Sequence, residues 1–504
     1  MKYNALFLND EHLINIEPVF FKDLKLDIIA KACFGNKDDS YLIPYFYTAL
    51  NDKESIIYRQ EVFKELEDEK FKTNFRIFIT KLIALKQQYD ELIINNQYCS
   101  KARLIKVMDE YILNLNELYN FLNESNLKAK AFLFLKEYIH EYLNSKFYLD
   151  FINDLKNIKE VFKTIKFSFV IDGSDIYVSK YDGDNDYSKR IKKVSSLFTY
   201  NKEFKKTNDN TFIQTINIDN SIYEKLAIIY EDEFKNIDLF FKNNKEFFNA
   251  EFANIAKDFR FYYAYLSFIE KIKNENLKFS IPIISDSFIE NSTNSFDLAL
   301  AYKYYKEQKE IICNSYEIKD GEKTIIISGP NQGGKTTFTR QFGQLHYLLK
   351  LGVPIQGEYN NIHLIDNIYT YFKTEENLDN LDGKLKIELE AVKKIFNNAS
   401  SNSIILFNEI FASTTAEDGL EIANLILDEI EKLGSFCVFV TFLNELKNRN
   451  GVVLMCSNVL KENKEIRTYK ITRTDVFDSA YPSSIQAKYG LTYENIRRRI
   501  KNEN

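Results

Sequence analysis

Residues 325–337 read IIISGPNQGGKTT, and the spacing of their glycines, lysine and threonines is that of a phosphate-binding loop. Gly329, Gly334, Lys335 and Thr336 fit the pattern G-x-x-x-x-G-K-T, between an apolar run that predicts a buried strand and a stretch that predicts a helix. Glycines let the backbone turn its N–H groups toward phosphate oxygens, and the helix N-terminus adds about half a positive charge. We therefore expect ATP to bind at Gly329, Pro330, Asn331, Gln332, Gly333, Gly334, Lys335, Thr336 and Thr337.

Two side chains of this loop have specific expected roles. Lys335 reaches the β- and γ-phosphates, and the Thr336 hydroxyl is a ligand for Mg²⁺. The second half of such a site is an acidic pair at the end of another buried strand, which SIILFNEIF supplies only in part. Glu409 is the candidate catalytic residue that activates the attacking water, whereas Asn408 is the candidate metal-site residue where an aspartate usually stands. The missing charge is expected either to slow hydrolysis or to weaken nucleotide binding.

The elements that must position these groups fall into two parts, because only three of the fifteen glycines precede residue 320. From about residue 19 to 165, apolar residues recur at steps of three and four with almost no helix breakers, which predicts a helical scaffold. The alternating stretches KFSFVIDG and SDIYVSKYDG predict a short hairpin near residues 166–181 that turns at Asp172 and Gly173. Helical periodicity then resumes from about residue 218 to 275.

The last part of the chain predicts a different architecture. Pro282 and a serine- and asparagine-rich stretch place a boundary near residue 280. Beyond it, apolar runs of four to eight residues alternate with helical stretches, the pattern of a parallel sheet covered by helices. We therefore expect a mixed fold, with an all-α core and lever region over residues 1–280 and an α/β P-loop NTPase domain over residues 281–504.

Composition excludes several classes of protein. The chain has 504 residues, of which 45% are apolar and 28% charged, the balance of a soluble globular protein. The net charge of −6 gives no overall basic field, so any contact with nucleic acid is expected to be local. The five cysteines form no CxxC pair, the first residues lack the features of a signal peptide, and no apolar run reaches the roughly 20 residues of a membrane span. A cytoplasmic location without membrane attachment is expected.

Several ordered motifs over about residues 310–500 resemble the ATPase domain of the MutS family of mismatch-repair proteins. GPNQGGKTT is similar to the family's GPN-GGKST loop, and NEIFASTTAEDGLEIA aligns without a gap with its DEIGRGTS-x-x-DGLAIA pattern. SAYPSSIQAKYGL is similar to its S-Y-G-x-x-x-A-x-x-x-G stretch. Upstream, Arg59 and Gln60 match a recurrent pair that opens the family's helical core, the alternative being two polar residues on a helix surface.

Some positions depart from the family pattern. The turn that in the family holds two glycines and an arginine here reads Phe411, Ala412 and Ser413. Phe442 replaces a histidine, and Leu385 replaces a serine that in relatives reaches the nucleotide of a partner subunit. Lys384 or Lys386 could substitute as the contact to that anion, the alternative being a solvated lysine at a helix start.

The resemblance implies a homodimer in which ATP and Mg²⁺ close two ATPase domains and move helical levers around double-stranded or branched DNA. The chain is expected to lack the N-terminal mismatch-recognition domain and the C-terminal nuclease module of some relatives. The strongest basic cluster, residues 189–206, follows the predicted hairpin, near where the family builds its clamp, and is either a DNA contact or a solvated helix face. The candidate DNA contacts are Lys189, Arg190, Lys192, Lys193, Lys205 and Lys206.

Two hypotheses for function stay open. The first is an ATP-dependent DNA-binding protein of the mismatch-repair family, in which ATP binding and slow hydrolysis accompany dimer closure on distorted or branched DNA. The second is a dimeric scaffold for protein partners that binds ATP but is deficient in hydrolysis, which Asn408, Leu385 and Phe442 favour. An ATPase of the wider ABC or chromosome-maintenance type is disfavoured, because the sequence has neither an LSGGQ-like segment nor a long coiled coil.

Overall fold

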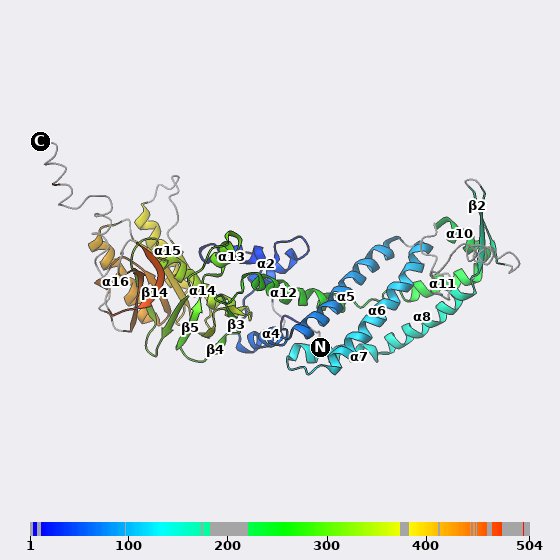
Figure 1. Cartoon of the computed structure of the whole chain (residues 1–504), viewed down its shortest axis with the longest axis horizontal. Helices are drawn as coiled ribbons and strands as arrows, with labels where there is room; N and C mark the ends of the chain where they lie inside the picture. The colour runs from blue at the N-terminus through cyan, green and yellow to red at the C-terminus, as the bar shows by residue number, and fades with distance from the viewer. Residues whose placement is uncertain are drawn as a thin grey trace, which may run out of the picture. The chain divides into compact units, whose positions relative to one another are not determined.

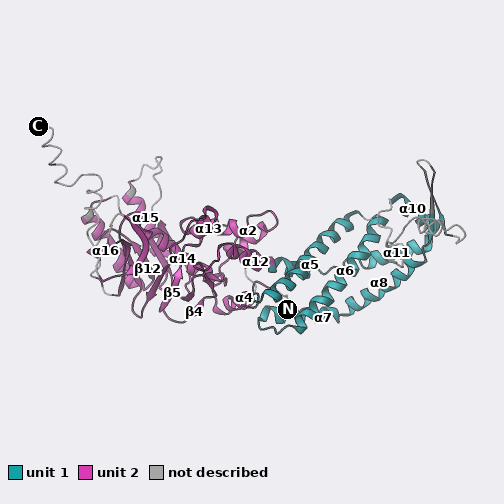
Figure 2. Cartoon of the chain, in the orientation of Figure 1, with its two compact units in different colours: residues 1–4, 65–259 teal, residues 5–64, 260–504 magenta. Residues whose placement is uncertain are grey.

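The structure is a computed structural model, and its contacts divide the chain into two compact units (Figure 2). Unit 1 holds residues 1–4 and 65–259, and unit 2 holds residues 5–64 and 260–504. The prediction of a mixed architecture is confirmed, since the N-terminal part is helical and the C-terminal part contains the sheets (Figure 1). Among the residues that the structure describes, no helix is long and apolar enough to cross a membrane. The described residues are 4–7, 12–95, 97–172, 175–181, 220–372, 383–411, 414–443, 445–446, 449, 451–460, 466–475 and 497.

Unit 1 consists mainly of long helices (Figure 1). The helices are α5 (Glu69–Asn95), α6 (Tyr98–Glu124), α7 (Lys130–Leu143), α8 (Lys146–Thr164), α10 (Asn220–Ile229), α11 (Glu231–Asn243) and the first part of α12 (Ala250–Ile272). The first two of these helices, α5 and α6, form an antiparallel pair, because only two residues separate them in sequence and they pack along their length.

Phenylalanine supplies much of the core of unit 1. Phe71, Phe75 and Ile79 on α5 are buried and recur at steps of four residues, so they lie on one helix face. The Phe75 ring meets the ring of Phe132 on α7 edge to face, with centroids 5.0 Å apart, and the ring of Phe259 on α12 at 4.7 Å. Such edge-to-face pairs add to the gain from burial, so this cluster fastens α5, α7 and α12 together.

A two-stranded hairpin follows α8 in the stretch where the sequence alternates. Strand β1 (Phe167–Asp172) pairs antiparallel with β2 (Asp175–Lys180), in a register that runs from Phe167 opposite Lys180 to Asp172 opposite Asp175. Gly173, at which we expected the turn, lies outside the described residues.

Unit 2 combines short N-terminal helices with three sheets among its described residues. Its helices are α1 (Phe21–Leu24), α2 (Leu26–Phe34), the 3₁₀ helix η1 (Ser40–Leu42), α3 (Ile43–Tyr47), α4 (Lys53–Glu65, except its last residue), the second part of α12, α13 (Leu298–Glu307), α14 (Lys335–Lys350), α15 (Lys384–Asn398) and α16 (Ala416–Leu433). Its strands are β3 (Phe279–Ser280), β4 (Ile283–Ser285), β5 (Glu290–Ser295), β6 (Asn314–Ile318), β7 (Thr324–Ser328), β8 (Ile355–Gln356), β9 (Tyr359–His363), β10 (Ile368–Phe372), β11 (Ile404–Asn408), β12 (Phe436–Val440), β13 (Val452–Val459) and β14 (Arg467–Arg473).

The central sheet has the strand order β10-β11-β12-β7-β13-β14. Its first five strands are parallel and only β14 runs antiparallel to its neighbour. The inner strands β11 and β12 are buried along their whole length, as continuous apolar runs such as IILF require. A smaller sheet has the order β4-β9-β5-β6, and β3 pairs with β8.

Helices cover both faces of the central sheet. Successive side chains of a strand point to opposite faces, so the helices that neighbouring residues of β11 contact lie on opposite sides of the sheet. Ile405 and Phe407 on β11 pack with residues of α15 and α16 in one apolar cluster. Leu406, between them, lies against α14, where a Cβ on Gly343 would approach its Cδ1 to 2.8 Å. Since α14 thus lies directly under β11, its N-terminus is brought to the end of that strand.

Arg59 on α4 is fully buried within unit 2, so the alternative of a helix-surface residue is wrong for it. Its guanidinium donates to the carbonyl oxygen of Leu6 from Nε at 3.1 Å and from Nη2 at 3.0 Å. It also donates from Nη1 to the carbonyl oxygen of Leu351 at 2.8 Å. The neighbouring Gln60 is also buried and donates to the carbonyl oxygen of Pro282. These side chains join segments that are distant in the sequence.

Candidate functional site

The glycine-rich loop, residues 329–334, connects β7 to α14 and lies close against β13. Gly329 and Gly334 have φ of 130° and 94°, which L side chains rarely adopt. A Cβ on Gly329 would lie 2.9 Å from the Ser457 Cβ, and one on Gly333 would lie 2.2 Å from the Ser457 Oγ. Ser457 also donates a hydrogen bond of 2.6 Å to the Gly333 carbonyl. Glycine is therefore required here both by backbone conformation and by the neighbouring strand.

The N-terminus of α14 has no side-chain cap. Its N-cap residue is Gly334, and no side chain accepts a hydrogen bond from the first turn at that position. The first N–H groups of a helix have no partner within the helix, and they carry the positive end of its dipole. An anion at this position would satisfy them, which is how helix N-termini bind phosphate.

Lys335 begins α14 and its side chain is only 3% exposed. Its ammonium donates to the carbonyl oxygens of Gly329 at 3.0 Å and Pro330 at 3.1 Å. It also lies 3.6 Å from the Glu409 carboxylate and 4.4 Å from the centroid of the Phe442 ring. Burial lowers the pKa of Lys335, and the Glu409 charge opposes that shift. The Lys335 ammonium is thus hydrogen-bonded to the backbone of the glycine-rich loop.

Thr336 and Asn408 are hydrogen-bonded to one another across the two halves of the site. The Thr336 hydroxyl donates to the Asn408 side-chain oxygen at 3.0 Å. Asn408 is buried at the end of β11, and the next residue, Glu409, donates its backbone N–H to the carbonyl of Val440 on β12. The Glu409 side chain is 25% exposed. The structure therefore brings together Lys335, Thr336, Asn408 and Glu409, which the sequence predicted from two separate motifs.

A cavity of about 490 Å³ opens over this cluster. The residues from Gln332 to Thr337 line it together with Glu409. The other predicted site residues, Gly329, Pro330, Asn331 and Asn408, are not part of the lining. Its volume is within the range typical of small-molecule sites. Other segments complete the wall, namely Asp297, Leu300, Tyr304, Glu310, Ile311, Ile312, Asn314 and Tyr469.

These additional wall residues were not predicted from the sequence. Tyr304 comes from α13, Ile312 from the segment before β6 and Tyr469 from β14, and none belongs to a phosphate-loop motif. Asn314 holds this side of the cavity, because its amide donates to the Tyr469 carbonyl at 3.2 Å and its oxygen accepts from the Ile471 N–H at 2.8 Å. Aromatic and apolar residues thus line the cavity together with the charged cluster, and such residues are suited to a flat base.

The turn after β11 is fastened by a carboxylate that sequence reasoning also missed. Glu388 on α15 is 1% exposed and accepts a hydrogen bond of 3.0 Å from the backbone N–H of Phe411. Phe411 has φ of 60°, a conformation that glycine adopts freely, at the position where the resemblance places a glycine. Ala412 and Ser413 lie outside the described residues.

The structure also describes residues at or beside positions where the sequence departs from the MutS pattern. Leu385, at the start of α15, is partly buried against the apolar cluster of its own unit. Lys386 is exposed, with its ammonium 4.0 Å from the Glu390 carboxylate. The Lys384 side chain lies outside the described part of the structure. Phe442 is 46% exposed beside Lys335.

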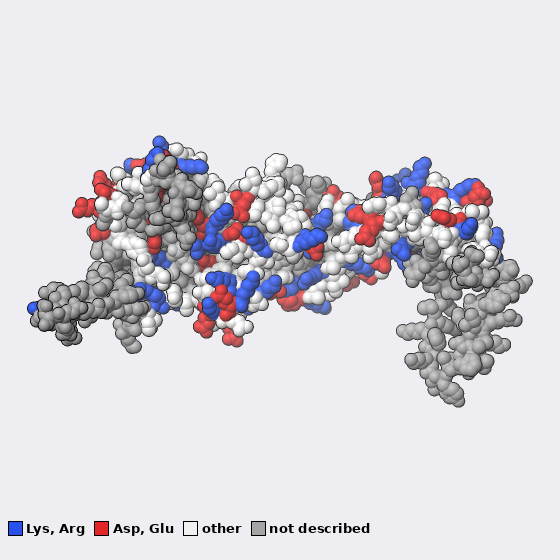
Figure 3. All heavy atoms as spheres, turned by 90° about the horizontal axis from the view of Figure 1, so that it is seen from above, with Lys and Arg blue, Asp and Glu red and all other residues white. Residues whose placement is uncertain are grey.

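The basic cluster predicted to contact DNA lies outside the described residues. This holds for all six candidates, Lys189, Arg190, Lys192, Lys193, Lys205 and Lys206. On the face drawn in Figure 3, acidic and basic side chains are intermixed over the described surface.

Comparison with known proteins identifies the domain around this site. Residues 325–496 match the family MutS domain V. Over 210 residues, or 40% of this chain, the sequence is 29% identical to the Endonuclease MutS2 of Staphylococcus carnosus, of which the match covers 26%. It is 29% identical over 215 residues, 41% of this chain, to the DNA mismatch repair protein MutS of Prochlorococcus marinus, of which 23% is covered.

A mammalian relative shows the same pattern. The chain is 25% identical over 177 residues, 33% of its length, to the MutS protein homolog 4 of Mus musculus, of which 18% is covered. The chain thus matches about a quarter or less of the length of each of these relatives. The matching segment contains the glycine-rich loop, Asn408 and Glu409. Residues 325–496 thus carry a MutS domain V, and the relatives that match this part of the chain include proteins named MutS, MutS2 and MutS protein homolog 4.

Proposed function

We propose that this chain is a MutS-like ATP-dependent DNA-binding protein whose ATP hydrolysis is slow. The observation that carries the proposal is the meeting of Lys335 and Glu409 with Thr336 and Asn408, at the uncapped N-terminus of α14 and under a cavity of about 490 Å³. The relatives named MutS support a role in DNA mismatch repair or a related DNA transaction. Dimer closure around DNA is part of the proposal.

The triphosphate is proposed to bind along the glycine-rich loop. Phosphate oxygens would accept hydrogen bonds from the loop and from the first turn of α14, where no side chain competes. Lys335 would exchange its bonds to the carbonyls of Gly329 and Pro330 for bonds to phosphate, because an ammonium binds an anionic oxygen more strongly than a neutral carbonyl oxygen. The base would then lie toward Tyr304, Ile312 and Tyr469.

Mg²⁺ fits the donors of the site, since it prefers oxygen ligands and keeps several waters. Thr336 Oγ1 and Asn408 Oδ1 would hold the ion and its waters, and the ion supplies charge neutralisation to the phosphates when bound. Both protein donors are neutral, so the protein contributes less negative charge here than an aspartate would. Glu409 would orient the attacking water and accept its proton.

A second candidate is a dimeric scaffold that binds ATP without useful hydrolysis. Asn408 favours it, and so does Leu385, which packs against its own unit and offers no polar atom to a partner's nucleotide. The discriminating experiment measures ATP turnover of the wild type and of Asn408→Asp, with and without branched DNA. Turnover in either protein supports the enzyme; no turnover in either, with ATP still bound, supports the scaffold.

DNA binding is tested separately on the basic cluster of residues 189–206. A gel-shift panel of homoduplex, mispaired, forked and four-way DNA, run with ATP and with ADP, ranks the substrates. Each DNA phosphate that a lysine or arginine neutralises should contribute about −0.9 to the slope of log K against log salt. We therefore expect replacement of Lys192, Lys193, Lys205 and Lys206 by glutamine to weaken binding and flatten the slope, and an unchanged slope would exclude this cluster.

A further inference from the structure

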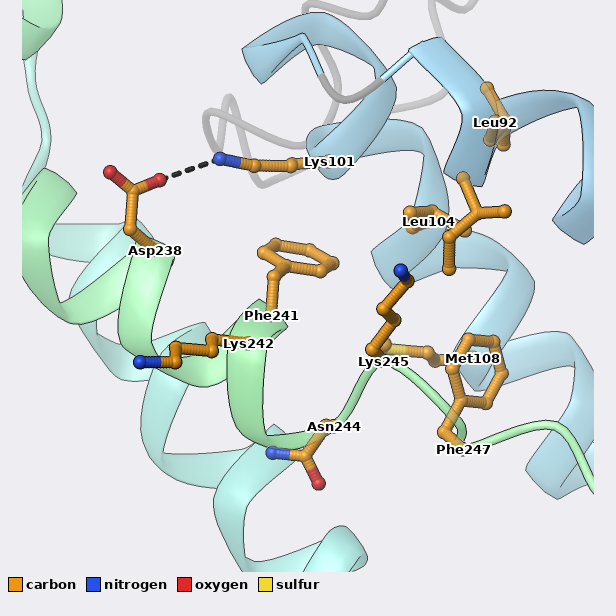
Figure 4. A pocket seen from close by; sticks show the side chains of 11 residues that line it. Leu92, Lys101, Leu104, Met108, Asp238, Phe241, Lys242, Asn244, Lys245 and Phe247 are labelled. Atoms are coloured by element: carbon orange, nitrogen blue, oxygen red, sulfur yellow. Dashed lines mark hydrogen bonds and ion pairs between the residues drawn. The ribbon is translucent and has the colours of Figure 1, made fainter.

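Unit 1 contains a cavity of its own, of about 580 Å³, beside α5, α6 and the end of α11 (Figure 4). None of its lining residues belongs to the candidate nucleotide site. Its volume is large enough for a small organic ligand. The apolar part of its wall consists of Leu92, Ile93, Leu104, Met108, Phe241 and Phe247.

Three lysines and one aspartate accompany this apolar wall. Lys101 is neutralised, because its ammonium lies 2.6 Å from the Asp238 carboxylate. That carboxylate also accepts a hydrogen bond of 3.1 Å from the Tyr98 hydroxyl, so Asp238 is already paired and does not neutralise a second lysine. Lys242 and Lys245 have no ion-pair or hydrogen-bond partner for their ammonium groups within the described part of the chain. The cavity therefore carries two uncompensated positive charges.

The orientation of the side chains brings charge and apolar surface together. In Figure 4 the Phe241 ring lies between Lys101 and Lys245, and the Lys245 side chain extends toward Leu104. An ammonium beside an apolar wall offers one strong site for an anion and a surface that gains from being covered. A neutral apolar ligand would leave both lysines without partners, and a purely ionic ligand would leave the wall in water.

We propose that this cavity binds a small amphipathic anion, an alkyl chain or flat ring that carries one carboxylate, sulfonate or phosphate. The apolar body lies against Leu104, Met108 and Phe241, and the anionic group pairs with the Lys245 ammonium, which points toward Leu104 in Figure 4. The Lys242 side chain extends away from these residues and adds a second positive charge at the edge of the cavity. The site is independent of the proposed ATP site and neither needs the other.

Two other ligand classes fit these residues less well. A divalent cation needs several oxygen ligands, but Asp238 is the only carboxylate of the lining, and the described residues contain no group of acids, histidines or cysteines able to hold a metal. Duplex DNA could place phosphates on the lysines, but its backbone has no apolar body to fill the cavity. Displacement by DNA is therefore an outcome that the test must include.

The test uses the full chain with ¹³C-labelled methionine methyl groups. The sequence has three methionines, so Met108 reports directly on the cavity, while Met455, buried in β13 of unit 2, is an internal control. Decanoate should shift the Met108 signal saturably and leave the Met455 signal in place. Acetate lacks the alkyl chain and 1-decanol lacks the charge, so each should have a Kd at least about tenfold higher than that of decanoate.

Variants connect the signal to the proposed contacts. The double substitution Lys242→Gln and Lys245→Gln should raise the Kd for decanoate about tenfold, because the charge that pairs with the anion and the second positive charge nearby are both lost. Leu92→Trp, at a partly exposed position, should weaken binding by filling part of the cavity. The matched control, Lys156→Gln with Lys225→Gln at exposed helix positions, should leave the Kd unchanged.

Three results would overturn the proposal. One is a Met108 signal that does not respond, or responds equally in the Lys242 and Lys245 double variant. Another is equal binding of 1-decanol and decanoate, which would make the cavity an apolar site without anion recognition. The third is displacement of decanoate by a DNA oligonucleotide from the wild type but not from the double variant, which would assign the lysines to nucleic acid.

Discussion

The buried carboxylate of Glu388 accepts a 3.0 Å hydrogen bond from the backbone N–H of Phe411, two residues after Glu409. Glu409 and Phe411 both have positive φ, 56° and 60°, although neither is glycine. Such conformations cost about 1–3 kcal/mol each and persist only where the surroundings hold them. Helix α15 therefore supports the strained turn that presents Glu409 to the cavity.

This relationship predicts a selective effect of Glu388→Met. Removing the acceptor leaves a buried N–H without a partner, which costs about 1–3 kcal/mol and loosens the turn at Glu409. We expect kcat for ATP to fall about tenfold or more in the Asn408→Asp background while the Kd for ATP stays within about twofold. Exchange of the Phe411 amide hydrogen should also accelerate.

The conservative variant Glu388→Gln separates positioning from general loss of structure. Its amide oxygen still accepts a hydrogen bond, so it should restore most of kcat and the protection of the Phe411 amide. Equal losses of ATP affinity and kcat in Glu388→Met would instead show that Glu388 only stabilises the fold.

Asn408→Asp is predicted to increase hydrolysis dependent on Mg²⁺. The substitution returns one negative charge beside Thr336, worth about 4 kcal/mol at 4 Å and an effective dielectric of 20. If all of that acts only in the transition state, turnover rises by about a thousandfold, and if it acts uniformly, ATP binding tightens instead. Steady-state turnover and ATP affinity at several Mg²⁺ concentrations distinguish these cases, and no change in either would remove the metal role of Asn408.

Arg59→Met is predicted to destabilise unit 2. The variant deprives the buried carbonyls of Leu6 and Leu351 of three donated hydrogen bonds. Each unsatisfied buried acceptor costs about 1–3 kcal/mol, so the loss of the bonds to these two carbonyls should lower the free energy of unfolding by about 2–6 kcal/mol in urea titration. The control Arg103→Met, at an exposed position of α6, should change it by less than about 0.5 kcal/mol. An equal loss in both variants would contradict the assigned role.

Lys350 gives a prediction for alkaline pH. It is buried at the end of α14, where its ammonium donates to the Asp366 carbonyl, and burial lowers its pKa from 10.5 to about 8, against the opposing charge of Asp366. Between these two values the unfolded chain binds a proton that the folded chain releases, so this group makes stability rise with pH. Lys350→Met should lose that rise. The difference in the free energy of unfolding, wild type minus variant, should therefore increase from about pH 7.5 to 9.5. A difference that stays constant with pH would refute the shifted pKa.

The sequence predicts the part of the site that comes from local motifs. Lys335 and Thr336 follow from glycine spacing, and Asn408 and Glu409 follow from their place after an apolar run, since parallel strands end at one edge of a sheet. The mixed helical and sheet-containing architecture is likewise readable from apolar periodicity, which changes from helical steps to short continuous runs.

The remaining contacts depend on the packing of distant segments. Tyr304 and Tyr469 reach one cavity from elements more than 150 residues apart by their numbering, and no local pattern pairs them. Glu388 is one of several charged residues on α15, and only its burial distinguishes it. The acceptors of Arg59 are backbone carbonyls, which any residue can supply, so neither partner is visible in the sequence.

Binding of a nucleoside triphosphate at the glycine-rich loop is expected to depend on Lys335. Isothermal titration of the full chain with ATP and Mg²⁺, beside Lys335→Ala and the exposed control Lys393→Ala, measures this most directly. We predict saturable binding in the wild type and in Lys393→Ala, and an affinity at least about a hundredfold weaker in Lys335→Ala. No binding to the wild type, or equal binding to Lys335→Ala, would show that the glycine-rich loop is not the nucleotide site.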